Sequence, residues 1–216
     1  MPVCNASRYL KKSIKSVLNQ SFRAFELIIC DDGSTDGSYE IAKQYQKEDS
    51  RIRLLRNSQN WGVARTRNKI LAAAVGKYIA PHDADDIMLA GRLAKGVEVL
   101  DRNPDIGVVF GHAITVEEKN RKEIRIAYAR KVLSDRQDKI TISGRVETYT
   151  KFPHGSATFR TKLVREAGGY LEHLKVGEDE DLFRRLWEKT NFYAINQIFY
   201  IYRIHSKSLT VKHGNL

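Results

Sequence analysis

The chain of 216 residues can build one domain with a full core and is too short for two comfortable ones. Its hydrophobic content of 42% and charged content of 29% are typical of a soluble globular protein, and no apolar run approaches the roughly 20 residues that span a bilayer. The formal net charge of +11 is compatible with nucleic acid, an anionic membrane face or anionic small substrates, but the basic residues are scattered along the sequence. The two cysteines, Cys4 and Cys30, show neither metal-ligand spacing nor a disulfide framework.

The first half of the sequence alternates helix and strand patterns. Apolar residues from Leu10 to Leu18 recur at helical spacing, so an amphipathic helix is expected there, with Asn5 or Ser7 as its N-cap. The apolar run 25–30 predicts a buried parallel strand. Further elements expected in chain order are a helix over 38–48, a strand over 51–56 near the sheet edge, a helix over 63–75 with Gly76 at C′, a strand over 78–81, a helix from Arg92 that is broken at 103–105 and a strand over 108–110.

The second half is less regular. Residues 117–139 are polar without a firm period and are expected to form a variable loop or hairpin. A strand is expected over 156–160, followed by a short helix capped by Thr161 and a helix that starts near Glu178 and Asp179. Strands alternating with helices predict an α/β fold with a mostly parallel central sheet between helical layers, in a single domain over 1–216.

Two acidic clusters close two of the predicted strands. Asp31 and Asp32 follow the first, and Asp83, Asp85 and Asp86 follow the strand over 78–81. The carboxyl ends of parallel strands are where open α/β sheets bind ligands, and carboxylates suit Mg²⁺ or Mn²⁺. The sequence therefore predicts a site for a nucleoside diphosphate with its metal. The competing interpretation is structural: acids cap helix N-termini, and Asp32 before Gly33 fits an Asx-turn.

In its ordered motifs the chain resembles family 2 glycosyltransferases with the GT-A fold. Seven motifs occur in the family's order, from Pro2 to Ser208. They are Pro2-Val3-Cys4-Asn5 through Ser21, Phe25-Glu26-Leu27-Ile28-Ile29 with Asp31-Asp32-Gly33-Ser34-Thr35-Asp36, Asn60 with Gly62, Arg67 and Asn68, Asp83-Ala84-Asp85-Asp86, Gly168-Gly169-Tyr170, Gly177-Glu178-Asp179, and Tyr202-Arg203-Ile204-His205 with Ser208.

The resemblance implies a Rossmann-like, three-layer GT-A domain whose first half, 1–111, binds donor and metal and whose second half, 112–216, binds the acceptor. It implies transfer of a sugar from a nucleoside diphosphate donor, typically a UDP-sugar, to a hydroxyl group with inversion of the anomeric centre. The residues that it assigns to the nucleotide sugar are Pro2, Val3, Asp31, Asp32, Arg67, Asp83 and Ala84. The residues that it assigns to a Mn²⁺ or Mg²⁺ ion are Asp85, Asp83 and His205, with Asp86 behind them.

The resemblance also implies roles for Asp179, His205 and Arg67, of which the first two have alternatives. Asp179 matches the catalytic base, with Glu178 as its rival, and base catalysis is worth roughly 10² to 10⁴ in rate. His205 ligates the metal if its imidazole is neutral and pairs with the diphosphate if it is charged. Arg67, a planar bidentate donor, is expected to bridge the base pocket and the metal carboxylates.

The chain departs from the family in one respect. Members usually carry several apolar residues before the segment matched by Pro2-Val3, and these form the first central strand. We therefore expect a shortened first strand. One alternative is that the chain is a catalytically impaired, N-terminally truncated fragment. A basic sugar- or nucleic-acid-binding module is the non-enzymatic alternative; a nucleotidyltransferase would need a glycine-rich basic loop, which residues 5–12 lack.

The expected partners follow from the same resemblance. They are a nucleoside diphosphate sugar and a saccharide or lipid-linked acceptor of cell-surface polysaccharide or glycolipid synthesis, and nucleic acid is not expected. A cytoplasmic location is expected, with peripheral association at the inner face of the cell membrane as an analogy to such enzymes.

Overall fold

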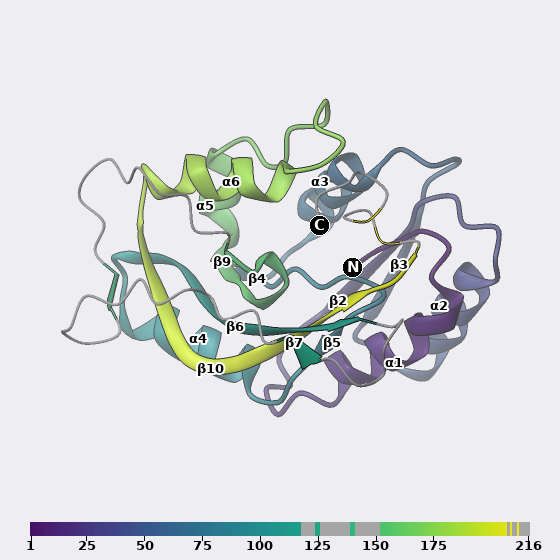
Figure 1. The fold of residues 1–216 in the computed structure, drawn as a ribbon, viewed down its shortest axis with the longest axis horizontal. Coiled ribbons are helices and arrows are strands. Elements are labelled where there is room, and N and C mark those ends of the chain that lie inside the picture. Colours follow the sequence, from purple (N-terminus) through teal and green to yellow (C-terminus); the bar gives the residue numbers. More distant parts are fainter. Residues whose placement is uncertain (118–123, 126–138, 141–151, 207, 209–210, 212–216) are drawn as a thin grey trace.

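The structure, a computed structural model, describes residues 1–117, 124–125, 139–140, 152–206, 208 and 211. It has the predicted α/β fold, with strands in two separate sheets (Figure 1). In this view α3, α5 and α6 lie above the strands, α1 lies below β2 with α2 beside it, and β10 passes beneath α4. Among the described helices, none has the length and apolar composition needed to cross a membrane.

The first sheet comes from the N-terminal third of the chain. Strands β1 (Pro2–Val3), β2 (Leu27–Asp31) and β3 (Ile52–Arg56) lie in the order β1-β2-β3, all parallel. All five residues of β2 are buried, which explains why its sequence is a continuous apolar run rather than an alternating one. The predicted edge position of β3 is confirmed.

Helices α1 (Ser7–Leu18), α2 (Ser38–Glu48) and α3 (Val63–Ala73) connect these strands and lead to the second sheet. The buried stripe of α1, including Leu10 and Ile14, packs with Ile29 of β2 in one hydrophobic cluster. This cluster holds the carboxyl end of β2, and with it Asp31 and Asp32, in a fixed place.

The second sheet is mixed. Its order is β4 (Tyr78–Ile79), β9 (Thr158–Arg160), β6 (Ile106–Glu117), β10 (Asn191–Ile204) and β5 (Ile87–Met88), with β7 (Ile124–Arg125) on β6 and β8 (Lys139–Ile140) on β10. Among the described strands of this sheet only β6 and β10 pair in parallel, and the other pairs are antiparallel. The prediction of a mostly parallel sheet therefore holds for the first sheet and not for the second.

Strand β10 has no counterpart among the predicted elements, and β6 is far longer than the expected strand over 108–110. The pairing of β10 with β6 shifts register between residues 194 and 200, so its buried positions follow no single alternation. The loop expected over 117–139 lies outside the described residues apart from its end residues and β7.

The remaining helices support the second sheet. They are α4 (Arg92–Arg102), the 3₁₀ turn η1 (His154–Ser156), α5 (Thr161–Glu166) and α6 (Glu178–Trp187). The predicted face of α6 is buried, with Leu182, Phe183 and Leu186 in the cluster that contains Phe159 of β9 and Phe192 of β10. This aromatic core fixes the start of α6 above the sheet.

Several predicted helix ends are wrong. Neither Asn5 nor Ser7 caps α1; the Ala6 and Ser7 amides donate instead to Ser38 Oγ at 2.9 Å and Asp36 Oδ2 at 3.0 Å, so residues at the start of α2 cap the first helix. Helix α3 ends at Ala73, and the chain is already extended at residue 74, before Gly76. The Thr161 hydroxyl does not cap α5 but donates to the Gly76 carbonyl at 2.7 Å.

Candidate functional site

The acidic loop between β4 and β5 is the centre of the site. No helix begins there, because β5 follows Asp86 directly, so the helix-cap interpretation of Asp83, Asp85 and Asp86 is wrong. The Asp83 amide donates to the Tyr200 hydroxyl at 3.2 Å, which ties the loop to β10. The three carboxylates take different places: those of Asp83 and Asp85 are partly exposed, and Asp86 is fully buried.

Arg67 connects this loop to the second half of the chain. One arm of its guanidinium donates to Asp83 Oδ1 at 2.9 Å and the other to Glu178 Oε1, which is 111 residues further along the sequence. Burial opposes ionisation of Asp83, but the Arg67 charge outweighs it and lowers the pKa of Asp83 to about 2. Burial likewise opposes the Arg67 charge, yet Asp83 and Glu178 raise the pKa of the guanidinium. Arg67 therefore contacts a carboxylate of the predicted metal site, Asp83, as expected. Its second described contact is with Glu178 and not with Asp31 or Asp32 of the predicted nucleoside site.

The two candidate bases at the start of α6 are in different surroundings. Glu178 is buried against Arg67, and burial raises the pKa of its carboxyl. Asp179 is half-buried, and its Oδ1 accepts the Glu180 amide at 2.9 Å. The Glu178 carboxylate is thus paired with Arg67 inside the protein, whereas the Asp179 carboxylate is partly open to solvent.

The buried side chains of Tyr170 and His154 lie next to Arg67. The Tyr170 ring lies 5.5 Å from the guanidinium carbon, and the Tyr170 hydroxyl is 2.9 Å from His154 Nε2. Burial, and then the charge of Arg67, lowers the pKa of His154 to about 4, so this imidazole is neutral at pH 7. Neither residue was predicted as part of the site, although Tyr170 lies in one of the family's motifs.

Asp85 meets His205 across 120 residues of sequence. His205 Nε2 lies 3.0 Å from Asp85 Oδ2, and the His205 ring stacks on Tyr9 of α1 with 4.7 Å between centroids and 25° between planes. The Arg203 side chain donates to the Asp85 carbonyl at 2.7 Å. The end of β10 and the start of α1 therefore hold Asp85 and His205 together.

Asp86 lies behind this pair. Its Oδ1 accepts the Arg203 amide at 2.7 Å, which fastens the acidic loop to β10. Burial and then the neighbouring Asp85 charge raise the pKa of Asp86 well above its ordinary value. A carboxyl that favours its neutral form and is fully buried is a poor cation ligand, so it supports the loop from within.

The predicted nucleoside residues lie at the carboxyl end of the first sheet. Asp31 is fully buried, with its Oδ2 accepting the Ser34 amide at 3.3 Å and lying 3.4 Å from Arg56 Nε. Pro2 is half-buried and Val3 is buried in β1, beside this end of β2. Ala84 is buried in the acidic loop.

Asp32 carries more contacts than its predicted role implied. Its carboxylate accepts the Asn57 side-chain amide at 2.8 Å, the Trp61 amide at 2.8 Å and the Gly62 amide at 3.0 Å. These bonds hold the loop that leads into α3, on which Arg67 stands. Among the described contacts of Asp32 the Asx-turn alternative is not observed, because its carboxylate accepts from Asn57, Trp61 and Gly62 instead.

The donor groups of Asp85 and His205, with Asp83 nearby, suit a hard divalent cation. Among the described residues no three acidic, histidine or cysteine side chains are close enough to form a complete metal cluster. Mg²⁺ in nucleotide enzymes needs only one or two protein carboxylates, with substrate phosphates and water filling the other positions. The partly exposed Asp85 carboxylate with its imidazole neighbour fits that kind of incomplete site.

Comparison with known proteins matches most of the chain. The family model described as glycosyl transferase family 2 matches residues 1–166. The putative glycosyltransferase EpsE of Bacillus subtilis (strain 168) is 36% identical over 211 residues, covering 96% of this chain and 72% of that protein. A Campylobacter jejuni protein named GalNAc(5)-diNAcBac-PP-undecaprenol beta-1,3-glucosyltransferase is 30% identical over 206 residues, covering 94% of this chain and 63% of that protein.

Solved glycosyltransferases share the fold. S. aureus TarS in complex with UDP superposes with a TM-score of 0.74 at 19% identity, covering 94% of this chain and 59% of that one. Mannosyltransferase PcManGT from Pyrobaculum calidifontis, in complex with GDP-Man and Mn²⁺, gives a TM-score of 0.69 at 14% identity and covers 98% and 57%. The chain thus spans less than two thirds of these solved chains. The fold is that of GT-A glycosyltransferases, and by the family model and the EpsE match the chain belongs to glycosyl transferase family 2.

Proposed function

We propose that this chain transfers a sugar from a nucleoside diphosphate sugar, with UDP as the nucleotide, to a hydroxyl group of a saccharide or lipid-linked acceptor. The product belongs to cell-surface polysaccharide or glycolipid synthesis, and the anomeric configuration is inverted. Support for the donor comes from the TarS and PcManGT complexes with UDP and GDP-Man. Support for the acceptor class comes from the name of the C. jejuni relative, which acts on an undecaprenol-linked glycan.

The observation that carries this proposal is the bridge made by Arg67. It brings the loop of Asp83 and Asp85 together with the acids at the start of α6, which are about 95 residues apart in sequence. A donor diphosphate near Asp83 and Asp85 and an acceptor hydroxyl near the start of α6 would then have their reacting atoms close together. Proximity of this kind is a major source of rate enhancement.

In the proposed reaction the acceptor oxygen attacks the anomeric carbon while the bond to the diphosphate oxygen breaks. Asp179 takes the hydroxyl proton, and the bond electrons leave with the nucleoside diphosphate. Attack from the face opposite the leaving group inverts the anomeric carbon. Glu178 is unsuited to this task because its carboxylate is already paired with Arg67.

Asp85 and His205, with Asp83, are the proposed ligands of a Mn²⁺ or Mg²⁺ ion. When bound, such an ion neutralises charge that develops on the leaving diphosphate. The protein's own contribution is to hold the ligands in place: Tyr9 under His205, Arg203 on Asp85 and Arg67 on Asp83. The nearby acids would repel the diphosphate without a cation, so metal dependence is expected.

Incubation with UDP-sugars in the presence and absence of Mn²⁺ tests this function. Metal-dependent release of UDP, with transfer to an added acceptor, is the expected result. Absence of UDP release from every UDP-sugar, combined with salt-sensitive oligonucleotide binding that ignores metal, would instead establish the basic binding module. A screen of nucleotide sugars by thermal shift identifies the donor in the same samples.

We also propose peripheral association with the inner face of the cell membrane. The net charge of +11 favours contact with anionic lipid, and a lipid-linked acceptor would be presented there. Co-sedimentation with vesicles of anionic and of neutral lipid checks this, with binding to the anionic vesicles alone as the expected result.

A further inference from the structure

Helix α1 carries a row of basic side chains on its outer face. They recur at positions i, i+3, i+4 and i+7, so they share one side of the helix, and all of them are exposed: Arg8, Lys11, Lys12 and Lys15. This set is called the α1 basic stripe below. At a rise of 1.5 Å per residue the stripe is about 10 Å long. No acidic residue interrupts it, because the sequence of α1 contains none.

The α1 basic stripe works against the stability of its own helix. Residues three and four positions apart on a helix are neighbours, so Lys12 is repelled by both Arg8 and Lys15. Arg8 also stands in the first turn, where the helix macrodipole favours acids. Among the described contacts no acid pairs with Lys11, Lys12 or Lys15. The stripe therefore presents positive charge to an anionic partner outside the described chain.

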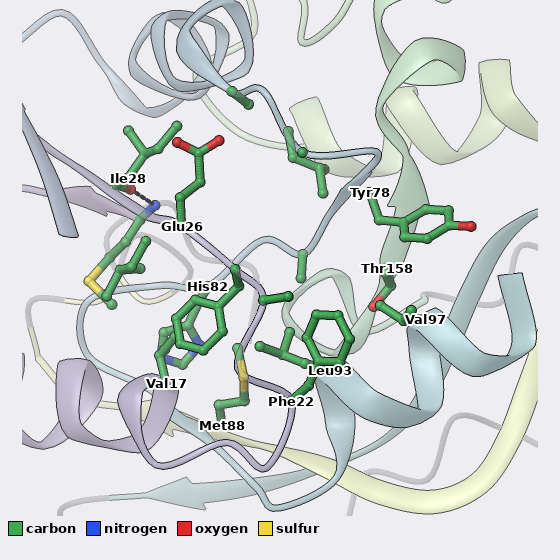
Figure 2. Close-up of a pocket in the computed structure, with 18 of the residues that line it drawn as sticks. Val17, Phe22, Glu26, Ile28, Tyr78, His82, Met88, Leu93, Val97 and Thr158 are labelled. Atoms are coloured by element: carbon green, nitrogen blue, oxygen red, sulfur yellow. Dashed lines mark hydrogen bonds between the residues drawn. The ribbon is translucent and has the colours of Figure 1, made fainter. Parts of the chain in front are cut away.

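The opposite face of α1 is turned inward and reaches the acidic loop. Ile14 and Val17 are buried in the core, and Figure 2 shows Val17 on the wall of a pocket that Met88 also lines. The Ser13 hydroxyl donates to the Asp83 carbonyl at 2.9 Å. Because a helix with its side chains is about 10 Å wide, the α1 basic stripe lies about one helix diameter from the proposed metal site.

A layer of anionic lipid headgroups fits this face better than a single-stranded nucleic acid does. Proteins that bind single strands combine a basic groove with exposed aromatic rings on which bases stack. The α1 face is the convex side of a helix, and its aromatic residue, Tyr9, is stacked on His205 instead. Among the described residues no large apolar side chain of α1 is exposed, so the contact is electrostatic and lacks an inserted apolar anchor.

We propose that the α1 basic stripe is the surface by which this chain docks on the anionic headgroups of a bilayer. With α1 against the headgroups, the acidic loop lies just beyond the helix, close to the level at which a lipid-linked acceptor presents its sugar. The inference rests on the proposed membrane association and adds which face of the molecule makes the contact.

The test replaces the three lysines of the stripe together, as Lys11→Gln, Lys12→Gln and Lys15→Gln. Each basic residue at an anionic surface contributes about a fivefold factor in affinity, so this variant is expected to bind phosphatidylglycerol vesicles roughly 100-fold more weakly than the parent chain. Co-sedimentation at low salt measures the affinity. Tm is expected to be no lower than that of the parent, because repulsion within the helix is relieved.

The matched control removes the same net charge from exposed positions on α4 and α5, as Lys95→Gln, Arg102→Gln and Lys162→Gln. These positions are not in the stripe, and charges further from the surface than a Debye length are screened, so the control is expected to bind the vesicles within about threefold of the parent. Equal losses in the two triple variants would show that net charge alone acts, and would overturn the proposal.

Salt and vesicle composition identify the kind of contact. Binding of the parent is expected to disappear in about 1 M salt, where the Debye length is about 3 Å, and to be absent on neutral phosphatidylcholine vesicles. Binding to neutral vesicles as tight as to anionic ones would overturn the proposal. Loss of oligonucleotide affinity in the stripe variant, with vesicle affinity unchanged, would overturn it in favour of a nucleic-acid surface.

UDP release from a UDP-sugar, measured with Mn²⁺ and acceptor in solution without vesicles, separates this inference from the proposed transfer. Both triple variants are expected to release UDP at the parent rate. A parent chain that releases UDP but does not bind anionic vesicles overturns the docking surface and leaves the transfer standing. Stripe-dependent vesicle binding by a chain that releases no UDP supports the docking surface and overturns the transfer.

Discussion

At the scale of single residues, Glu178 and Asp179 are adjacent in sequence but lie in different surroundings, because only Glu178 is paired with Arg67 among the described contacts. We expect Asp179→Asn to abolish sugar transfer while UDP binding and Tm stay as in the parent chain, because the amide cannot accept the acceptor's proton. Loss of the base is worth roughly 10² to 10⁴ in turnover. Steady-state transfer and calorimetric UDP binding measure the two effects, with Glu180→Gln in the same helical turn as control. Transfer by Asp179→Asn at parent rates would contradict the assignment.

Glu178→Ala is expected to act on stability instead. It removes one of two carboxylates from the buried Arg67 guanidinium, and breaking such a buried pair costs about 3–5 kcal/mol. Urea denaturation measures this cost, and Glu166→Ala on the exposed face of α5 is the control. A free energy of unfolding equal to that of the parent chain would show that Arg67 does not need Glu178.

Tyr9 is expected to act through His205. Its ring stacks on the imidazole at 4.7 Å between centroids, so Tyr9→Leu frees the ring that contacts Asp85, whereas Tyr9→Phe keeps the stack. We expect the leucine variant to bind UDP with Mn²⁺ several-fold more weakly and the phenylalanine variant to bind like the parent. Titration calorimetry with and without Mn²⁺ checks this, and equal affinities for the two variants would remove Tyr9 from the site.

At the scale of elements, β10 contacts both η1 and the acidic loop. A Cβ on Gly155 of η1 would lie 2.1 Å from Tyr200 Cζ, too close for any real contact, and Tyr200 holds the Asp83 amide. We expect Gly155→Ala to cost about 1–3 kcal/mol through overpacking and to weaken donor binding. Thermal denaturation and UDP titration measure both, with Val75→Ala at an exposed position as control. A change in neither quantity would mean that β10 can shift without disturbing the loop.

At the scale of the whole molecule, buried histidines make the fold sensitive to acid. The pKa of His154 falls to about 4 in the folded protein, and that of His82 to about 3, from 6.5 when unfolded; burial is the main cause. Below pH 6.5 the unfolded chain therefore binds more protons than the folded one, so stability falls as pH falls from 6.5 toward 4. His154 contributes up to about 3 kcal/mol to this loss.

Thermal denaturation between pH 4 and 8 measures this slope. His154→Gln, which has no imidazole to protonate, is expected to flatten it, while the exposed His173→Gln leaves it unchanged. A slope in His154→Gln as steep as that of the parent would exclude His154 as its source.

The sequence alone determined the features that depend on local pattern. Apolar spacing placed α1 and α4 correctly, because one buried helical face imposes a period on neighbouring residues, and turn and cap residues before Ser38 placed α2. A continuous apolar run placed β2, and the acids at the ends of β2 and β4 stood out because open α/β sheets bind ligands at the carboxyl ends of their strands. The ordered motifs then identified the family, which the comparisons confirmed.

Only the tertiary structure decided features that depend on distant contacts. Strand β10 escaped prediction because its register shifts hide any alternation, yet it positions Tyr200, Arg203 and His205. The start of α1 is capped from α2, some thirty residues away, which no local motif reveals. The family resemblance favoured Asp179 over Glu178, but the different surroundings of the two acids come from Arg67, because burial and charge at Glu178 are set by a residue 111 positions earlier.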